Sequence, residues 1–310
     1  EDKGAIPKMI INGDETVVGF LKDINFSVFD WLNEEGETFD IINGADMVII
    51  DSYLADLSFY KKISDRVKMP VYVDDNKRFK YPRGIVINGN IHAKEFDYPK
   101  EENINYLLGT RYIPLRKEFW DVSKRDVKEN IENVIITFGS DDGKDMTPGV
   151  LKLLAENYPA ITKNVVVGRD FQNVEAIKKV SDNKTNLIYY PDAEQMRDIM
   201  RKADIAISAG GQTLYELARV GVPTAVVAVA ENQLNNIEGC KKAGFIEYIG
   251  RYNDKDLFEN IGNLLERLYY KKRKTIDQIG RRFVDGQGAR RVVKELLTQY
   301  VKLSGKDDEK

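Results

Sequence analysis

The chain has 310 residues, of which 42% are hydrophobic and 31% charged, and its formal net charge is −3. This length suits one large domain or two of typical size, and no basic stripe suggests nucleic acid as a partner. No apolar run approaches the ~18 residues that a membrane span requires, and no secretory signal is visible. The single cysteine, Cys240, excludes an intrachain disulfide framework and favours a reducing, cytoplasmic location.

Short apolar runs alternate with helical patterns along the first third of the chain. Strands are expected at 8–13, 26–32, 46–53 and 70–75, helices at 15–24 and 54–67, and RGIVING (83–89) leads into a loop. Continuous apolar runs such as MVII are typical of strands covered on both faces. The alternation therefore predicts a parallel, doubly wound sheet.

A charged segment at 106–130 has no clean strand and reads as the connection between two units. Beyond it, strands are expected at 133–140, 164–169, 186–191, 204–210 and 223–230, and helices at 148–157, 174–180, 193–203 and 212–220 and within 254–303. We predict an α/β protein of two Rossmann-like domains with mainly parallel sheets, divided into 1–117, a linker at 118–131, 132–303 and a frayed tail at 304–310. A ligand is expected in the cleft between the domains.

Four strand ends of the second unit carry small or polar residues, in GSDDGKDMT, GRDF, AGGQT and ENQ. Because helix N-termini at such ends offer free N–H groups, these loops favour a nucleotide. Gly210 and Gly211 would adopt φ > 0 and approach a diphosphate, with the amides of Gln212 and Thr213 facing it and Glu216 accepting from a ribose diol. Alternatively, Gly-Gly is only a tight turn and Glu216 a favourable first-turn charge. Neither a Walker loop nor G-x-G-x-x-G is present, which disfavours ATPase and dehydrogenase functions.

The stretch ISAGGQTLYELARVGVPTAVVAVAENQ resembles the C-terminal signature of the UDP-sugar hydrolases of pseudaminic acid biosynthesis and of their spore-coat polysaccharide relatives. ADMVIIDSY, VYVDD, GIVINGNIHA, LLGTRYIPLRKEF, ITFGSDDGKDMT and VDGQGARRVV follow the order of that family. The resemblance implies a GT-B glycosyltransferase-like fold. It also implies hydrolysis of a UDP-linked 2,4-diacetamido-2,4,6-trideoxyhexose with inversion and release of UDP, without cofactor or metal.

The resemblance also implies roles for individual residues. Tyr53 and Asn232 would face the sugar and take part in catalysis. The UDP-binding positions would be Gly139, Ser140, Gly168, Met196, Gly210, Gly211, Thr213, Glu216 and Gln233. Two other functions stay open: a glycosyltransferase that needs an acceptor, or a non-catalytic nucleotide-sugar binding domain, fused to or partnered with a sugar-activating enzyme.

The N-terminus departs from the family pattern, which opens with a strand and a G-x-G-H-x-x-R loop whose histidine is the expected water-activating base. Because this sequence opens with EDKGAIPKMIING, the N-terminal domain is expected to lack that strand and Gly-rich loop. A segment carrying them is expected to precede residue 1. His92, in NGNIHAKEF, reads as a surface-loop residue and not as a substitute base.

Several other features allow two interpretations. The pairs Asp74–Asp75 and Asp141–Asp142 would either bind Mg²⁺ or serve as turn and cap residues. Tyr189 and Tyr190 would either stack on uracil or pack within the protein. The basic stretch ERLYYKKRKTIDQIGRRF touches a membrane or an acidic partner, or forms a solvated helix face. Cys240 is expected to be a packed side chain, and no His/Cys cluster has zinc spacing.

Overall fold

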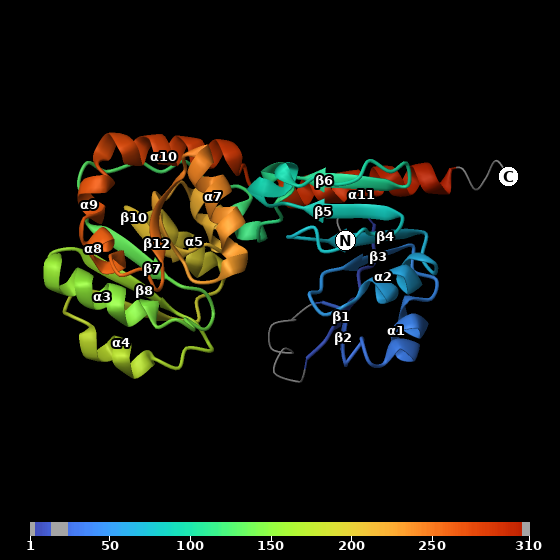
Figure 1. The fold of residues 1–310 in the computed structure, drawn as a ribbon, viewed down its shortest axis with the longest axis horizontal. Helices are drawn as coiled ribbons and strands as arrows, with labels where there is room; N and C mark the ends of the chain where they lie inside the picture. Colours follow the sequence, from blue (N-terminus) through green and yellow to red (C-terminus); the bar gives the residue numbers. More distant parts are fainter. Residues whose placement is uncertain (1–3, 14–23, 306–310) are drawn as a thin grey trace. The chain divides into compact units, whose positions relative to one another are not determined.

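The computed structural model describes residues 4–13 and 24–305 and divides the chain into two units (Figure 1). The first unit contains the chain up to Ile87, Tyr98–Leu107 and the residues from Thr298 onward. The second contains Asn88–Asp97 and Leu108–Leu297. These units differ from the expected domain limits at 88–97, 108–117 and 298–303, and the expected linker at 118–131 lies inside the second unit.

The first unit contains two sheets. Its elements in chain order are β1 (Met9–Ile11), β2 (Phe26–Val28), α1 (Glu35–Ile42), β3 (Met47–Ile50), α2 (Leu57–Ser64), β4 (Met69–Val73), β5 (Gly84–Asn88) and β6 (Ile104–Leu108). β1 and β2 form a parallel two-stranded sheet, and the other strands form a four-stranded sheet in the order β3-β4-β5-β6. The apolar run of β4 is buried, as expected for a strand covered on both faces. The run MVII, which was expected to be such a strand, instead forms the edge strand β3, and its Ile49 is 54% exposed.

Two sequence expectations in this unit need comment. β6 forms where the charged stretch from 106 onward predicted no strand, and its Ile104 and Leu107 are buried apolar side chains. The expected helix at 15–24 lies outside the described residues, except for its last residue.

The second unit is built on one parallel six-stranded sheet in the order β12-β11-β10-β7-β8-β9. Its strands are β7 (Asn133–Thr137), β8 (Thr162–Val167), β9 (Thr185–Tyr189), β10 (Ile205–Ala209), β11 (Thr224–Ala228) and β12 (Ile246–Arg251). Its α-helices are α3 (Met146–Asn157), α4 (Val174–Val180), α5 (Ala193–Lys202), α6 (Thr213–Val220), α7 (Leu234–Ala243), α8 (Leu257–Gly262), α9 (Leu264–Arg267), α10 (Tyr270–Phe283) and α11 (Gly288–Ser304), of which α11 continues into the first unit. β12 was not predicted, because this edge strand carries half-exposed polar residues that interrupt its apolar pattern.

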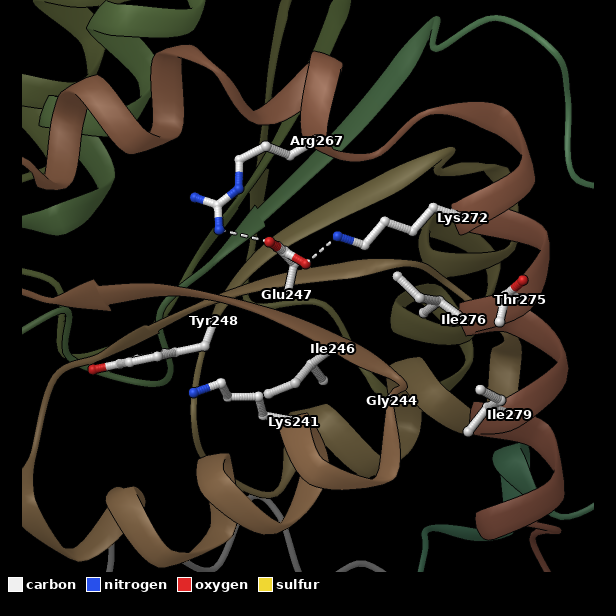
Figure 2. Close-up of a pocket in the computed structure, with 10 residues that line it drawn as sticks. All are labelled: Lys241, Gly244, Ile246, Glu247, Tyr248, Arg267, Lys272, Thr275, Ile276 and Ile279. Atoms are coloured by element: carbon white, nitrogen blue, oxygen red, sulfur yellow. Dashed lines mark hydrogen bonds and ion pairs between the residues drawn. The ribbon is translucent and has the colours of Figure 1, made fainter.

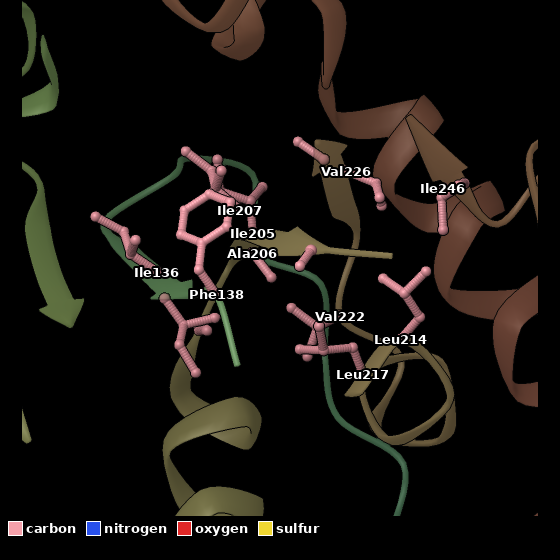
Figure 3. Close-up of a cluster of buried hydrophobic side chains, with 14 of the residues drawn as sticks. Ile136, Phe138, Ile205, Ala206, Ile207, Leu214, Leu217, Val222, Val226 and Ile246 are labelled. Carbon is pink, nitrogen blue, oxygen red and sulfur yellow. The ribbon is translucent and has the colours of Figure 1, made fainter. Parts of the chain in front are cut away.

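The core of this unit lies between the central strands and the helices on both faces of the sheet. Ile207 pairs in register with Ile136 of the neighbouring strand, and Leu214 and Leu217 of α6 pack against the same cluster (Figure 3). Each such side chain contributes roughly 1.5–3 kcal/mol when fully buried. α3 packs beside α4 and α8, whereas α6 packs beside α5 and α10, so the two helical layers enclose the sheet (Figure 1).

The basic helix α10 is anchored to this unit. Ile276 is buried, and a Cβ at Gly280 would lie 3.2 Å from the carbonyl oxygen of Ala218 in α6. The buried Arg273 donates to the backbone carbonyls of Leu268, Lys128 and Glu129. Within the described part of the chain, no helix is long and apolar enough to cross a membrane.

Candidate functional site

Two glycines mark open backbone at the carboxyl edge of the six-stranded sheet. Gly139 follows β7 and Gly211 follows β10, and these strands are parallel neighbours, so both loops emerge at the same edge. A Cβ built on either glycine would meet no heavy atom within 4 Å. Gly139 also has φ = +92°, a conformation that L side chains rarely adopt. The backbone at both positions can therefore be approached closely from outside.

Two other glycines of the expected nucleotide site serve packing instead. A Cβ at Gly210 would lie 2.5 Å from Cδ1 of Ile237, and one at Gly168 would lie 2.1 Å from the carbonyl oxygen of Ser140. The expectation that Gly210 and Gly211 adopt φ > 0 is wrong, because neither has a positive φ. Gly210 is small so that α7 can pack against the loop, whereas Gly211 borders open space.

The N-terminus of α6 presents unpaired donors beside Gly211. The N–H groups of Gly211, Gln212 and Thr213 have no hydrogen-bond acceptor among the residues that the structure describes, whereas the Leu214 amide bonds to the Gly211 carbonyl. Unpaired amides and the positive end of the helix dipole attract anions. This turn can therefore hold an anionic group such as a phosphate.

Two amide side chains hold the Gly210 peptide in place from the side of α7. Gln233 Oε1 accepts from the N–H of Gly210 at 3.1 Å and from that of Val229 at 3.2 Å. Asn236 Nδ2 donates to the carbonyl oxygen of Gly210 at 2.9 Å, and Asn236 Oδ1 accepts from the Tyr215 hydroxyl. The sequence indicated Gln233 as a UDP contact, but its side-chain oxygen is engaged in orienting the loop.

Replacing Asn236 by alanine should destabilise this loop. The change removes a buried hydrogen bond and leaves the Gly210 carbonyl without this donor, which costs roughly 1–3 kcal/mol. Thermal unfolding would show a melting temperature lowered by several degrees. Asn235→Ala, at an exposed position of the same helix, is the matched control and should leave the melting temperature unchanged. Equal melting temperatures for the two variants would contradict this role of Asn236.

Glu216 lies in the first turn of α6, as expected, but its carboxylate is buried and already paired. Arg116 donates from Nε to Oε1 at 2.8 Å and from Nη2 to Oε2 at 2.9 Å. The side chain of Glu216 is 7% exposed and that of Arg116 is 44% exposed. The sequence pattern gave no signal for this partner, which lies one hundred positions away in the chain.

The loop after β7 is organised by a buried aspartate. Asp142 accepts from the N–H groups of Met146 and Thr147 at the start of α3 and from Asn173 Nδ2. Burial raises the pKa of Asp142 despite these hydrogen bonds. This carboxylate thus occupies the N-terminus of α3 that the sequence offered to an anion, which confirms the cap interpretation for this member of the acidic pair. No group of three or more potential metal ligands occurs among the described residues.

The remaining expected contacts of the second unit differ in their exposure. Met196 is buried in the core on α5, and Asn232 is exposed in the short 3-10 turn Glu231–Gln233 after β11. Tyr189 and Tyr190, at the carboxyl end of β9, are 43% and 47% exposed, so they are not simply packed side chains. The guanidinium of Arg169 lies 5.2 Å from the ring centroid of Tyr190.

In the first unit, Tyr53 forms a hydrogen bond with an aspartate that follows β4. Its hydroxyl donates to Asp75, and the residue is 58% exposed. Desolvation of the hydroxyl raises the pKa of Tyr53, and the bond to Asp75 acts in the same direction, so Tyr53 is a neutral donor at ordinary pH. Arg78 donates to the Tyr53 carbonyl at 2.7 Å, and Asp74 accepts from the Tyr98 hydroxyl at 2.9 Å, which makes Asp74 a structural residue.

His92 and Cys240 are both buried in the second unit. The expectation that His92 is a surface-loop residue is wrong: it is 5% exposed, in a 3-10 turn, with its ring edge-to-face against Phe96. Such burial does not suit a base that must reach a substrate. Cys240 is fully buried on α7, as expected for a packed side chain, and burial raises the pKa of its thiol.

Two cavities border β12. The smaller, about 250 Å³, lies at the carboxyl ends of β11 and β12, where Glu231 pairs with Arg251 and Lys144 lies 4.8 Å from the ring centroid of Tyr252. The larger, about 410 Å³, lies beside the start of β12, where Glu247 bonds Arg267 and Lys272 (Figure 2). The carboxylate of Glu247 is thus neutralised by these two cations. This cavity lies at the amino ends of the strands, whereas Gly211 lies at their carboxyl ends.

Comparison with known proteins agrees with this architecture. The chain is 28% identical over 233 residues to an uncharacterized protein of Methanocaldococcus jannaschii, covering 71% of this chain and 48% of the relative. It is 23% identical over 257 residues, 80% of this chain and 47% of the relative, to the Helicobacter pylori pseudaminic acid cytidylyltransferase and UDP-2,4-diacetamido-2,4,6-trideoxy-beta-L-altropyranose hydrolase. It is 26% identical over 268 residues to the Bacillus subtilis spore coat polysaccharide biosynthesis protein SpsG, covering 82% of this chain and 77% of SpsG. The chain therefore spans about half the length of the first two relatives.

Solved structures show the same fold at low sequence identity. Acinetobacter baumannii MurG matches with a TM-score of 0.65 and 15% identity, covering 96% of this chain and 92% of MurG. Anabaena HepE, solved in complex with UDP and glucose, matches with a TM-score of 0.62 and 13% identity, covering 94% of this chain and 91% of HepE. The GT-B-like fold and the resemblance to the pseudaminic acid and spore-coat proteins are confirmed.

A family model covers the unit that carries the anion-binding turn. Residues 133–287, half of the chain, match the glycosyltransferase family 28 C-terminal domain. The match begins at β7 and ends just before α11, so it includes every strand of the six-stranded sheet, Gly139, Gly211 and Glu216. The chain belongs to the glycosyltransferase family 28 C-terminal domain family.

Proposed function

We propose that this protein binds a UDP-sugar and cleaves the bond between the anomeric carbon and the diphosphate with water, releasing UDP. The observation that carries the proposal is the turn at Gly211, where three amides of the α6 N-terminus border open backbone and have no acceptor in the described part of the chain. Such a turn suits a diphosphate. The hydrolase named in the H. pylori relative and the UDP complexes of HepE support this ligand class.

In the proposed reaction, the oxygen of water forms a bond with the anomeric carbon while the bond to the diphosphate oxygen breaks. The bonding electrons leave with UDP, and the amides at Gly211–Thr213 stabilise the charge that develops on the diphosphate. The proton released by water passes to a base, a role for which the buried His92 is not placed. Asn232 is proposed to orient the sugar, which belongs to the 2,4-diacetamido-2,4,6-trideoxyhexoses.

A glycosyltransferase is the second candidate, favoured by the match to the family 28 domain and by the fold of MurG. Both candidates share the UDP site and differ in what accepts the sugar. Fold alone does not separate them.

Calorimetric titration with UDP, ADP and CDP tests the ligand, and UDP release from a UDP-sugar tests the reaction. Selective binding of UDP supports the site, and binding of no nucleotide refutes it. UDP release in water alone supports the hydrolase. Release that requires an added acceptor sugar supports the transferase.

Replacing Asn232 by alanine should affect only the sugar end of the ligand. Affinity for UDP should stay within about twofold, whereas affinity for the UDP-sugar should fall roughly tenfold, because a hydrogen bond to the sugar is lost. Parallel titrations with UDP and the UDP-sugar measure both values. Asn235→Ala, exposed on the following helix, is the control. A fall in UDP affinity equal to that for the UDP-sugar would contradict this placement of Asn232.

A further inference from the structure

The cavity of about 410 Å³ beside the start of β12 lies at the amino ends of the strands, whereas the proposed UDP site lies at their carboxyl ends. Its lining comes from the end of α7, from β12, and from α9 and α10 (Figure 2). β12 is the last strand in the order of its sheet, so no described strand covers its outer edge. The volume lies within the range of small-molecule sites, about 300–1,000 Å³. This edge of the sheet can therefore hold a small ligand.

One wall of the cavity is apolar. Ile246 of β12 and Ile276 of α10 are 6% and 4% exposed, and Ile279 lies one helical turn beyond Ile276 on the same face of α10. Gly244 adds no side chain, and a Cβ at this position would lie 3.4 Å from Cδ1 of Ile279. An apolar group that entered the cavity would be removed from water along this wall, which favours its binding.

The rest of the lining is charged, with three cations and one carboxylate. Glu247 accepts from Arg267 Nη2 at 2.6 Å and from Lys272 Nζ at 2.5 Å. The third cation is Lys241, at the end of α7. Figure 2 shows Arg267 and Lys272 reaching the same carboxylate from two sides. Because one carboxylate faces three cations, two positive charges remain in excess within the lining.

The cations keep most of their hydrogen-bond donors. Arg267 uses one of its five N–H groups on Glu247, and Lys272 uses one of its three; neither donates to another acceptor among the described residues. Their side chains are 36% and 33% exposed and line the cavity, so a ligand can reach the remaining donors. Lys241 has only a 3.6 Å contact with the exposed Glu238, and such surface pairs are weak.

We propose that this cavity binds a phosphate monoester that carries an apolar body. The phosphate would accept from Arg267, Lys272 and Lys241, since a guanidinium donates to paired oxygens and a lysine supplies a point charge. Such a phosphate carries about −1.5 to −2 charges at pH 7, which matches the excess positive charge of the lining. The apolar body would lie against Ile246 and Ile276. The inference goes beyond the proposed UDP site and does not depend on it.

Calorimetric titration of the full chain with 1-naphthyl phosphate tests the ligand class. This probe should bind at least about tenfold more tightly than 1-naphthol or inorganic phosphate, because each of those lacks one half of the recognised chemistry. No binding of 1-naphthyl phosphate, or equal affinity for all three probes, overturns the inference.

Lys272→Met tests the charge at the site. It should weaken binding of 1-naphthyl phosphate about tenfold, because a charge-assisted hydrogen bond is lost, while Arg267 still pairs with Glu247. Lys274→Met is the matched control, since Lys274 is exposed on the same helix and does not line the cavity. Equal affinity in the two variants contradicts the proposed phosphate contact.

Thr275→Trp tests the location without removing any charge. Thr275 is exposed, lines the cavity and belongs to no ion pair, so the variant should fold and fill the space, and should abolish binding. Gln278→Trp, at an exposed position of α10 outside the lining, should bind as the wild type does. Binding that survives in Thr275→Trp overturns the inference, also if Lys272→Met does not fold. If Gly211→Val abolishes that binding, the phosphate lies at the turn of α6 instead.

A phosphate monoester with an apolar body can be a soluble molecule or a lipid. Sedimentation with phosphatidylcholine vesicles that contain phosphatidic acid distinguishes the two sources. Vesicle binding that Thr275→Trp abolishes assigns the ester to a lipid head group, and any other result assigns it to a soluble molecule. Both outcomes keep the phosphate site that the titrations establish, and they differ only in where its ligand comes from.

Discussion

Replacing Gly211 by valine is expected to abolish UDP binding without changing the thermal stability of the protein. A Cβ at this position meets no heavy atom within 4 Å, so the folded protein has room for the new side chain. That same space is where the proposed diphosphate approaches the amides of Gly211–Thr213. Because hydrogen bonds to charged groups contribute ~1.5–3 kcal/mol each, losing them should weaken UDP binding roughly 100-fold or more. The melting temperature should hold, since surface substitutions usually change stability by less than about 0.5 kcal/mol.

Two variants make this result specific. Gly262→Val places the same side chain in open space at the end of α8 and should change neither binding nor stability. Gly210→Ala should lower the melting temperature, because its Cβ would lie 2.5 Å from Ile237. UDP affinity that survives in Gly211→Val would place the diphosphate elsewhere.

The sequence predicts the central strands of this fold well, for a physical reason. β10 and β11 are covered on both faces, so every position is apolar or small and the run is visible without any partner. β12 lies at the edge of the sheet and tolerates polar residues such as Glu247, which breaks the pattern. The division of the chain into two units could not be predicted from the sequence either. Residues 88–97 and 108–117 belong to the second unit, although the segment between them belongs to the first.

At the site, residue types could be predicted, but their individual roles could not. Gly210 and Gly211 look alike in the sequence, yet one faces α7 and the other faces open space. The carboxylate of Glu216 was expected to be available, and its pairing with Arg116 depends on a contact between distant segments. Similarly, nothing in NGNIHAKEF distinguishes a buried histidine from an exposed one, because the burial of His92 comes from tertiary packing.

Gly168→Ala is expected to be strongly destabilising, although it adds a single methyl group. The new Cβ would lie 2.1 Å from the carbonyl oxygen of Ser140 and 2.8 Å from its Cα. These are backbone atoms of a loop that also accepts a hydrogen bond from the Asp170 amide at 3.1 Å, so the loop cannot yield by rotating a side chain. Overpacking of this kind costs roughly 3 kcal/mol or more. That should lower the melting temperature by about 6–12 °C for a unit of this size.

Differential scanning calorimetry of Gly168→Ala beside Gly211→Ala measures this effect, since both add the same methyl group at the same edge of the sheet. Gly211→Ala should have the same melting temperature as the wild type, because its Cβ has room. Equal melting temperatures for the two variants would mean that the Gly168 and Ser140 loops are not held in contact. If the contact does hold, the fraction of Gly168→Ala that still folds should bind UDP more weakly than the wild type does. The displaced Ser140 loop carries Gly139, and the open backbone at that position would move with it.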